Sequence, residues 1–352
     1  MGVALPKFLN PLKPLYWAFF GARQRKDYVP QAISVGIASL FGNRSMVKQT
    51  WDGGQTLAGA KDVAVLVTWD AGGRVHDFLL AHIKGLSEAG RTVIVVSNSP
   101  KCPEKEVAKA LPHCALFAWR TNRGYDFGAY RDGLKLVPDY DALDSLIFIN
   151  DSTYGPFQKL GPILKKMKPA EADVWGLTES WDTRWHLQSY FLLFHRAALQ
   201  NGKVRALWDD WKHVNSKSWI INKLEIGLTG RLTKAGLRCK AVWPYRPMVT
   251  SFCEDVRKHD LTNEESLAQQ HRELLKFMCH LADHGAPMNP CHFFWDRLIL
   301  DGFAYLKREV LTSNPIGMPR LYEWSDVISS VSRYDTEMIV DHLRVIAKNR
   351  VI

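Results

Sequence analysis

Four apolar runs in the first half of the chain constrain its fold more than any other feature of the sequence. They read VAVLVTW, TVIVVSN, CALFAW and SLIFIND and span residues 63–69, 92–98, 114–119 and 145–151. Continuous apolar, β-branched runs of this length are typical of strands buried on both faces. Segments with helical spacing follow the first two runs, at 76–90 and 103–111. Such an alternation predicts an α/β fold with a Rossmann-like, mainly parallel sheet flanked by helices.

The second half of the chain has a looser pattern. Strands are predicted at 173–178, 187–195 and 238–243, and helices at 218–235 and 262–284. We find no internal repeat and no low-complexity linker, so one domain with C-terminal helical additions is preferred to two domains. The predicted organisation is a basic and aromatic arm over 1–60, an α/β domain over 61–315 and a helical extension over 316–352.

Composition and charge narrow the class of protein. With 352 residues the chain can bury a large core, and its six cysteines form no CxxC pair, so a reduced cytoplasmic protein is expected. No apolar run approaches the ~20 residues of a membrane span. The 46 Lys and Arg outnumber the 36 Asp and Glu, and this net charge of +10 favours anionic partners. No nucleic-acid-binding module is recognisable, so nucleic acid is not an expected partner.

The first 28 residues combine basic and aromatic side chains. The basic residues are Lys7, Lys13, Arg23, Arg25 and Lys26, and Phe8, Trp17, Phe19 and Phe20 lie among them. This mixture suits the surface of an anionic membrane, so peripheral membrane contact is predicted. An arm that packs on the domain is the alternative. Prolines at positions 6, 11 and 14 exclude one long amphipathic helix.

Polar residues follow the predicted strands at their carboxyl ends, where open α/β sheets bind ligands. The candidate ligand-binding residues there are Asp70, Asn98, Asn122, Arg123, Gly124, Asn150, Asp151 and Ser152. Gly124 and Gly128 allow close approach of the backbone, and a helix from about residue 128 would present free N–H groups to an anion. The oxygens of residues 150–152 suit Mg²⁺ or Mn²⁺ together with substrate phosphates. An Asx turn that caps the strand is the alternative.

Glu225 lies in an apolar helical stripe. The stripe consists of Ile221, Leu224, Leu228 and Leu232. At roughly 100° per residue, Glu225 falls about 40° from Ile221. Burial raises the pKa of a carboxyl group, as a general base requires, so Glu225 is a candidate catalytic residue. A salt bridge to Arg231 or Lys223 is the alternative.

Aromatic and polar residues gather in two further segments. The segment 175–194 contains three tryptophans, and the segment 289–299 contains a fourth. Aromatic platforms with polar edges fit sugar rings, and core packing explains the tryptophans equally well. The candidate residues for binding a sugar acceptor are Glu179, His186, Gln188 and Trp295. His292 is a candidate metal ligand with Asp151, and a core or capping role is its alternative.

Several stretches of the chain follow one another in a specific order. They read NRGYDFGAYRDGL, FINDSTYGPF, DVWGLTES, HLQSYFLLF, LEIGLTGRLTKAG and NPCHFFWDRLI with GFAYLKREVL, within about residues 62–315. Together they resemble the rhamnan synthesis protein F family of bacterial polysaccharide glycosyltransferases. The resemblance implies a GT-A-like fold and inverting transfer of a deoxysugar, typically L-rhamnose from dTDP-rhamnose. The acceptor implied is a lipid-linked polysaccharide or O-antigen at the cytoplasmic face of the inner membrane.

The resemblance also implies roles for individual residues. In many GT-A enzymes a DxD motif after the fourth strand holds a divalent metal on the donor diphosphate. Here that position reads Asn150-Asp151-Ser152, in which only the middle residue is acidic, so dependence on Mg²⁺ or Mn²⁺ stays open. The segment LEIGLTGRLTKAG places Glu225 at the catalytic base. Apart from the resemblance, Asp126 at the exit of the third predicted strand is the second catalytic candidate. Transfer of another nucleotide sugar, or a non-catalytic glycan-binding or assembly role, are the alternatives.

Overall fold

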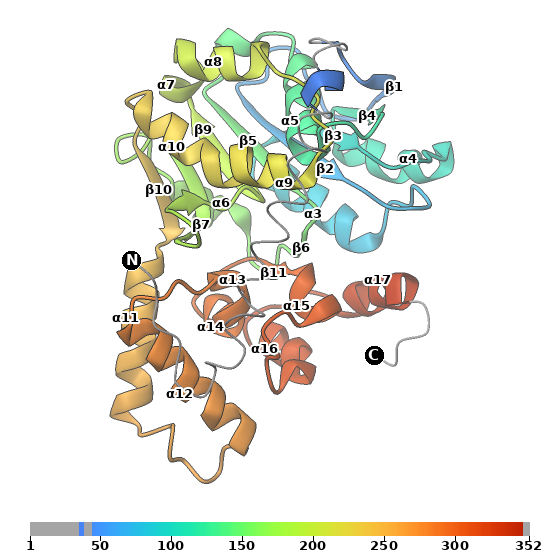
Figure 1. Cartoon of the computed structure of the whole chain (residues 1–352). Helices are drawn as coiled ribbons and strands as arrows, with labels where there is room; N and C mark the ends of the chain where they lie inside the picture. The colour runs from blue at the N-terminus through green and yellow to red at the C-terminus, as the bar shows by residue number, and fades with distance from the viewer. Residues whose placement is uncertain (1–34, 39–43, 348–352) are drawn as a thin grey trace.

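A nine-stranded sheet forms the centre of the molecule (Figure 1). The structure is a computed structural model, and it describes residues 35–38 and 44–347. Its order is β1-β4-β3-β2-β5-β9-β7-β10, with β8 paired to β7. The strands are β1 (Val47–Asp52), β2 (Asp62–Thr68), β3 (Thr92–Ser97), β4 (Leu116–Arg120), β5 (Ser145–Asn150), β7 (Val174–Ser180), β8 (His186–Leu187), β9 (Phe191–His195) and β10 (Cys239–Trp243).

The core of this sheet is parallel. Strands β4, β3, β2 and β5 pair in parallel, as do β7 and β10, whereas β9 runs antiparallel to both β5 and β7. All four strands predicted from the apolar runs are present, and the predicted α/β class with a mainly parallel sheet is confirmed. The predicted strand 187–195 is wrong in its bounds, because a turn after Leu187 separates β8 from β9.

Strand β1 lies within the segment predicted as an N-terminal arm. It pairs antiparallel with β4 and so forms one edge of the sheet. Most of its residues are exposed or half-buried, and it therefore lacks the continuous apolar run of a central strand. The first 28 residues, with their predicted membrane contact, lie outside the described residues.

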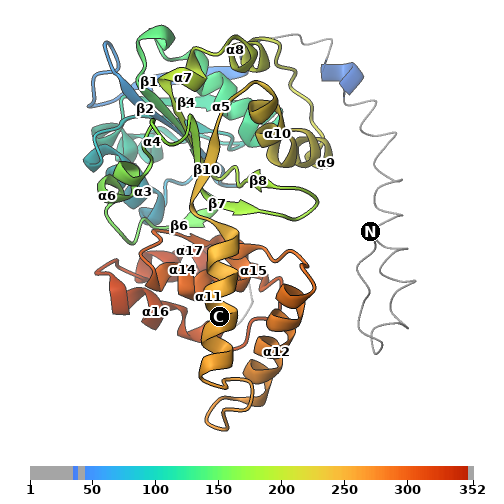
Figure 2. The same ribbon diagram turned by 90° about the vertical axis from the view of Figure 1, so that its left-hand side faces the viewer.

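Helices cover both faces of the sheet (Figure 2). On one face lie α3 (Asp77–Glu88), α4 (Glu104–Ala110) and α6 (Leu160–Lys166), and on the other α5 (Tyr125–Lys135), α8 (Gly202–Asp209) and α10 (Ile226–Lys234). Alternation along β2 supplies both cores, since Leu66 belongs to the first and Val65 to the second. Each buried side chain of this size contributes about 1.5–3 kcal/mol.

The C-terminal helices lie beyond the carboxyl ends of the strands (Figure 1). Helices α11 (Tyr245–Lys258) and α12 (Gln269–Asp283) project as a hairpin around a small core of their own. The predicted helix 262–284 is thus shorter than expected, and α11 was not predicted. Five further helices follow: α13 (Pro290–Phe293), α14 (Trp295–Leu300), α15 (Arg308–Ser313), α16 (Trp324–Val331) and α17 (Glu337–Ala347).

A two-stranded ribbon joins these helices to the sheet. Strand β6 (Thr153–Tyr154) directly follows the turn after β5, and β11 (Leu306–Lys307) directly precedes α15. The two pair antiparallel, with Leu306 opposite Tyr154 and Lys307 opposite Thr153. The amide of Arg308 also donates to the carbonyl of Ser152 at 2.9 Å. The ribbon therefore holds residues 306–308 against the carboxyl end of the central strand β5.

Candidate active site

Three acidic residues predicted from separate motifs share one electrostatic environment. Asp126 lies in the first turn of α5, Asp151 follows β5, and Glu225 precedes α10. Burial raises the pKa of Asp126 to about 7, and the negative charges of Asp151 and Glu225 add to this shift. Asp151 and Glu225 thus lie near enough to Asp126 to influence its pKa.

Lys307 balances this cluster, and the sequence analysis did not identify it. Its Nζ donates to Ser152 Oγ at 3.0 Å and lies 4.3 Å from the centre of the Tyr190 ring. Its positive charge lowers the pKa of Asp126 and that of Glu225, against the opposing effect of burial. Only the adjacent basic pair in GFAYLKREVL indicates such a role in the sequence, and the pair carries no motif of its own.

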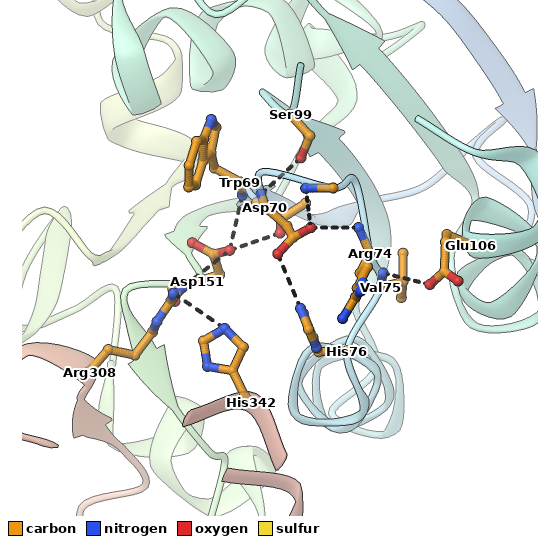
Figure 3. Close-up of polar contacts among 12 residues, drawn as sticks. Trp69, Asp70, Arg74, Val75, His76, Ser99, Glu106, Asp151, Arg308 and His342 are labelled. Atoms are coloured by element: carbon orange, nitrogen blue, oxygen red, sulfur yellow. Dashed lines mark hydrogen bonds and ion pairs between the residues drawn. The ribbon is translucent and has the colours of Figure 1, made fainter. Parts of the chain in front are cut away.

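Arg308 and Asp151 form a charged contact at the site (Figure 3). Arg308 Nη1 donates to the carbonyl of Asp151 at 2.9 Å and lies 3.6 Å from Asp151 Oδ2. The same Oδ2 accepts hydrogen bonds from Thr68 Oγ1 at 2.8 Å and from the amide of Trp69 at 3.0 Å. Asp151 therefore ties the end of β2 to the start of α15.

Trp69 is a second residue that the sequence analysis missed. It directly follows β2, and 48% of its surface is exposed. Figure 3 shows Asp151 between Trp69 and Arg308. An exposed indole beside basic and acidic groups can stack against the flat ring of a ligand.

The loop before α5 has an unusual backbone. Gly124 and Tyr125 have φ values of 76° and 50°, and the left-handed region costs a residue such as tyrosine roughly 1–3 kcal/mol. Helix α5 begins at Tyr125 rather than near residue 128, so Gly128 lies in its first turn. A Cβ at Gly128 would lie 2.3 Å from the carbonyl oxygen of Arg123, which explains the need for glycine there.

A buried arginine holds this loop in place. Arg120 donates to the carbonyl of Arg123 at 2.7 Å, to Asp132 Oδ2 at 2.8 Å and to Asn98 Oδ1. Asn98 is itself buried, so its side chain serves this network in the structure. Asn122 is exposed at the loop and Gly124 is buried beneath it. The predicted donor-binding roles of these loop residues stay predictions.

The other predicted donor-binding residues make local contacts. Asn150 Nδ2 donates to Asp126 Oδ2 at 2.8 Å, and Asn150 Oδ1 accepts from the amide and hydroxyl of Ser152 at 3.1 and 2.6 Å. The Asx turn considered as an alternative is therefore present. Asp70 accepts from the amides of Gly72 and Arg74 and lies 3.2 Å from His76 Nε2. Burial opposes ionisation of Asp70, but these hydrogen bonds lower its pKa overall.

Glu225 ends a distorted helical segment. The predicted helix 218–235 consists of α9 (Lys217–Ile220), a π-helical segment (Ile221–Glu225) and α10. Burial raises the pKa of Glu225, and Lys307 and Lys217 oppose the shift. Among the described residues the Glu225 carboxylate has no hydrogen bond and no ion pair, whereas Arg231 donates to the carbonyl of Lys223 at 2.8 Å. The alternative salt bridge is therefore not formed, and the carboxylate has capacity for a ligand.

The predicted acceptor-binding residues contact other parts of the protein. Glu179 accepts from the indole of Trp185 at 2.8 Å and from the amide of Tyr245 at 3.0 Å. Gln188 accepts from Thr178 at 2.6 Å, and His186, whose pKa burial lowers, contacts the carbonyl of Arg184. Trp295 is 5% exposed and packs in the core. Their role in acceptor binding stays a prediction.

His292 pairs with Glu309 rather than with a second metal ligand. The distance from His292 Nε2 to Glu309 Oε2 is 3.2 Å. Across residues 35–38 and 44–347 no group of three or more His, Cys, Asp or Glu side chains is arranged to hold a metal. The predicted metal role of Asp151 and His292 is not tested by these contacts.

Comparison with known proteins identifies the family of the chain. The family described as Rhamnan synthesis protein F matches residues 93–351. The chain belongs to this family. The match includes the C-terminal helices after residue 315, which the sequence resemblance had left out, and it begins later than the first predicted strand.

Individual relatives are more distant. Virulence protein VirA of Vibrio anguillarum is 27% identical over 250 residues, which cover 70% of this chain and 77% of VirA. Glycosyltransferase GlyE of Streptococcus pneumoniae TIGR4 has a TM-score of 0.37 and 8% identity, over 83% of this chain and 67% of GlyE. For S. aureus TarS 1–349 the TM-score is 0.34 and the identity 11%, over 76% of this chain and 81% of that one.

Membership of the rhamnan synthesis protein F family supports the class of polysaccharide glycosyltransferase. Such an enzyme needs a nucleotide-sugar donor and a glycan acceptor, and the site offers carboxylates, basic side chains and an exposed indole to them. Within the described part of the chain, no helix is both long and apolar enough to span a membrane.

Proposed function

We propose that this protein is an inverting glycosyltransferase that moves L-rhamnose from dTDP-rhamnose onto a lipid-linked glycan. The observation that supports this most is the Glu225 carboxylate, which has a raised pKa and no protein partner among the described residues. An acceptor hydroxyl is a weak nucleophile until a base takes its proton, and a positioned base accelerates such a step by about 10²–10⁴.

The proposed reaction has one chemical step. Glu225 takes the proton of the acceptor hydroxyl while the acceptor oxygen attacks the anomeric carbon of the donor. The bond from that carbon to the phosphate oxygen breaks, and dTDP leaves with the electron pair. Attack from the face opposite the leaving group turns a β-configured donor into an α-linked product. Asp126, held by Asn150 and protonated below a pH of about 7, is suited to hydrogen-bond a sugar hydroxyl.

Trp69 supplies a second part of the donor site in this proposal. Its exposed ring at the end of β2 would stack on the thymine base, and stacking of a base on an aromatic side chain is worth about 1–3 kcal/mol. The rhamnosyl donor itself rests on the family, because the described contacts do not select a sugar.

A panel of nucleotide sugars tests the proposal. Thermal shift and nucleotide release are measured for dTDP-rhamnose, dTDP-glucose, UDP-glucose and GDP-mannose with the full chain and with Glu225→Gln. Stabilisation by both dTDP sugars and turnover with dTDP-rhamnose alone are expected. Selectivity for another sugar would correct the donor, and a chain that binds glycans but no nucleotide sugar would be a non-catalytic subunit.

The acceptor also implies a place in the cell. We propose peripheral contact with the anionic inner membrane through the first 28 residues, since a lipid-linked acceptor is presented there. Flotation with phosphatidylglycerol vesicles is expected to retain the full chain at low salt and to release it in 1 M NaCl, because salt screens surface charge to roughly 3 Å at that concentration. Removal of residues 1–28 with unchanged flotation would contradict this contact.

A further inference from the structure

The basic pair Lys307-Arg308 is held at the end of β5 by backbone contacts on both sides. The β6–β11 ladder places Lys307 opposite Thr153, and the amide of Arg308 bonds to the carbonyl of Ser152. Side chains that project from a paired strand and the first turn of a helix are positioned more tightly than those of a free loop. Two positive charges are therefore built into the place where the donor is proposed to bind.

The same place fits a divalent ion poorly. Oδ1 of Asn150 accepts from Ser152, and Oδ2 of Asp151 accepts from Thr68 and from the amide of Trp69. Ser152 Oγ accepts from Lys307. These three oxygens of the 150–152 turn thus already have protein donors, and an ammonium group lies at hydrogen-bond distance from the last of them. Asp151 Oδ1 is the one side-chain oxygen of this turn that has no donor among the described residues. Mg²⁺ needs near-octahedral oxygen ligands at about 2.0–2.1 Å, and a turn with one free oxygen supplies few of them.

Both basic side chains have the chemistry to bind a phosphate. Arg308 keeps 21% of its side chain exposed, and its planar fork suits phosphate oxygens. Lys307 is half-buried on a flexible stem, and its one described hydrogen bond, to a neutral hydroxyl, is readily exchanged for an anionic oxygen. Among the described residues Lys307 forms no ion pair with the neighbouring carboxylates, so its charge is available to a ligand.

We propose that Lys307 and Arg308 neutralise the donor diphosphate in place of a divalent ion, so that donor binding and transfer need no added metal. This rests on the proposed function in taking the donor to be a nucleotide sugar. When the bond to the sugar breaks, the leaving diphosphate gains one negative charge, and fixed cations at that position stabilise it as it develops.

The test is calorimetric binding of dTDP to the full chain, after treatment with EDTA and again with 5 mM MgCl₂ or MnCl₂. The dissociation constant is expected to agree within about 2-fold between these conditions. Lys307→Met is expected to weaken binding by about 10- to 100-fold, because hydrogen bonds to charged groups contribute about 1.5–3 kcal/mol. Lys307→Arg should retain most of the affinity. Lys276→Met, on α12, makes the same change of charge outside the site and should leave binding unchanged.

The outcomes separate the metal-free inference from the proposed function. Binding that is lost in EDTA and restored by metal overturns the inference while leaving the proposed function intact, as does wild-type affinity in Lys307→Met. The EDTA comparison uses the unaltered chain, so it remains valid even if Lys307→Met has a lowered melting temperature. In that case Arg308→Gln is the second variant. Failure of the unaltered chain to bind dTDP under any condition would instead contradict the proposed function.

Discussion

At the scale of single residues, Glu225 carries the strongest prediction. Glu225→Gln keeps the size of the side chain and removes the base, so turnover is expected to fall by about 10²–10⁴ while dTDP affinity stays close to that of the unaltered chain. Steady-state transfer and calorimetry measure the two quantities. Donor binding that weakens together with the melting temperature would show that Glu225 has a structural role.

Asp126 is expected to make donor affinity depend on pH. Its pKa is raised to about 7, so it is neutral below that pH and becomes a third negative charge beside Asp151 and Glu225 above it. Added negative charge repels a diphosphate, and dTDP binding should therefore weaken as the pH rises through about 7. Asp126→Asn should remove this dependence. If dTDP affinity changes with pH in the same way in both proteins, a group other than Asp126 causes the change.

How far the site could be predicted depends on the range of the contacts. Asp126, Asp151 and Glu225 were identified because each follows a local pattern, either a strand end or a helical stripe. Lys307 and Arg308 could not be, because their position depends on the pairing of two-residue strands that are far apart in sequence. Trp69 was read as the last residue of an apolar strand, and the structure leaves its ring exposed.

At the scale of secondary structure, we expect the start of α5 to be the most sensitive to substitution. Gly128→Ala is expected to lower the free energy of unfolding by about 1–3 kcal/mol, because the new methyl group meets the carbonyl of Arg123 and displaces the loop. Urea unfolding measures this. Gly161→Ala is the matched control, since it lies in α6 with no atom within 4 Å of a Cβ, and it should stabilise by about 0.5–1 kcal/mol.

The same scale shows which elements a sequence pattern predicts well. The central strands are buried on both faces and so read as continuous apolar runs. Edge strand β1 is exposed or half-buried along its length, so it has no continuous apolar run by which to identify it. The π-helical segment before α10 has the same apolar stripe as a regular helix, so no pattern distinguished it.

At the scale of the whole molecule, helix α17 brings His342 to the site. His342 lies 2.8 Å from Tyr154 Oη and 3.5 Å from Arg308 Nη2, and its ring contacts that of His76 (Figure 3). His342→Ala is expected to weaken dTDP binding by about 2- to 10-fold through loss of support for Arg308. His259→Ala, at the exposed residue that directly follows α11, is the control. A lower melting temperature with unchanged dTDP affinity would limit α17 to a structural role.

The ribbon of β6 and β11 also bears on how the protein is made. Thr153 and Lys307 are paired although 154 positions separate them (307 minus 153). A ribosome that adds about 5–20 residues each second needs about 8–30 s to cover that interval. Asp126 and Asp151 are synthesised well before Lys307, whose positive charge lowers the pKa of Asp126 in the folded protein. A nascent chain therefore contains most of the sheet well before it has a complete donor site.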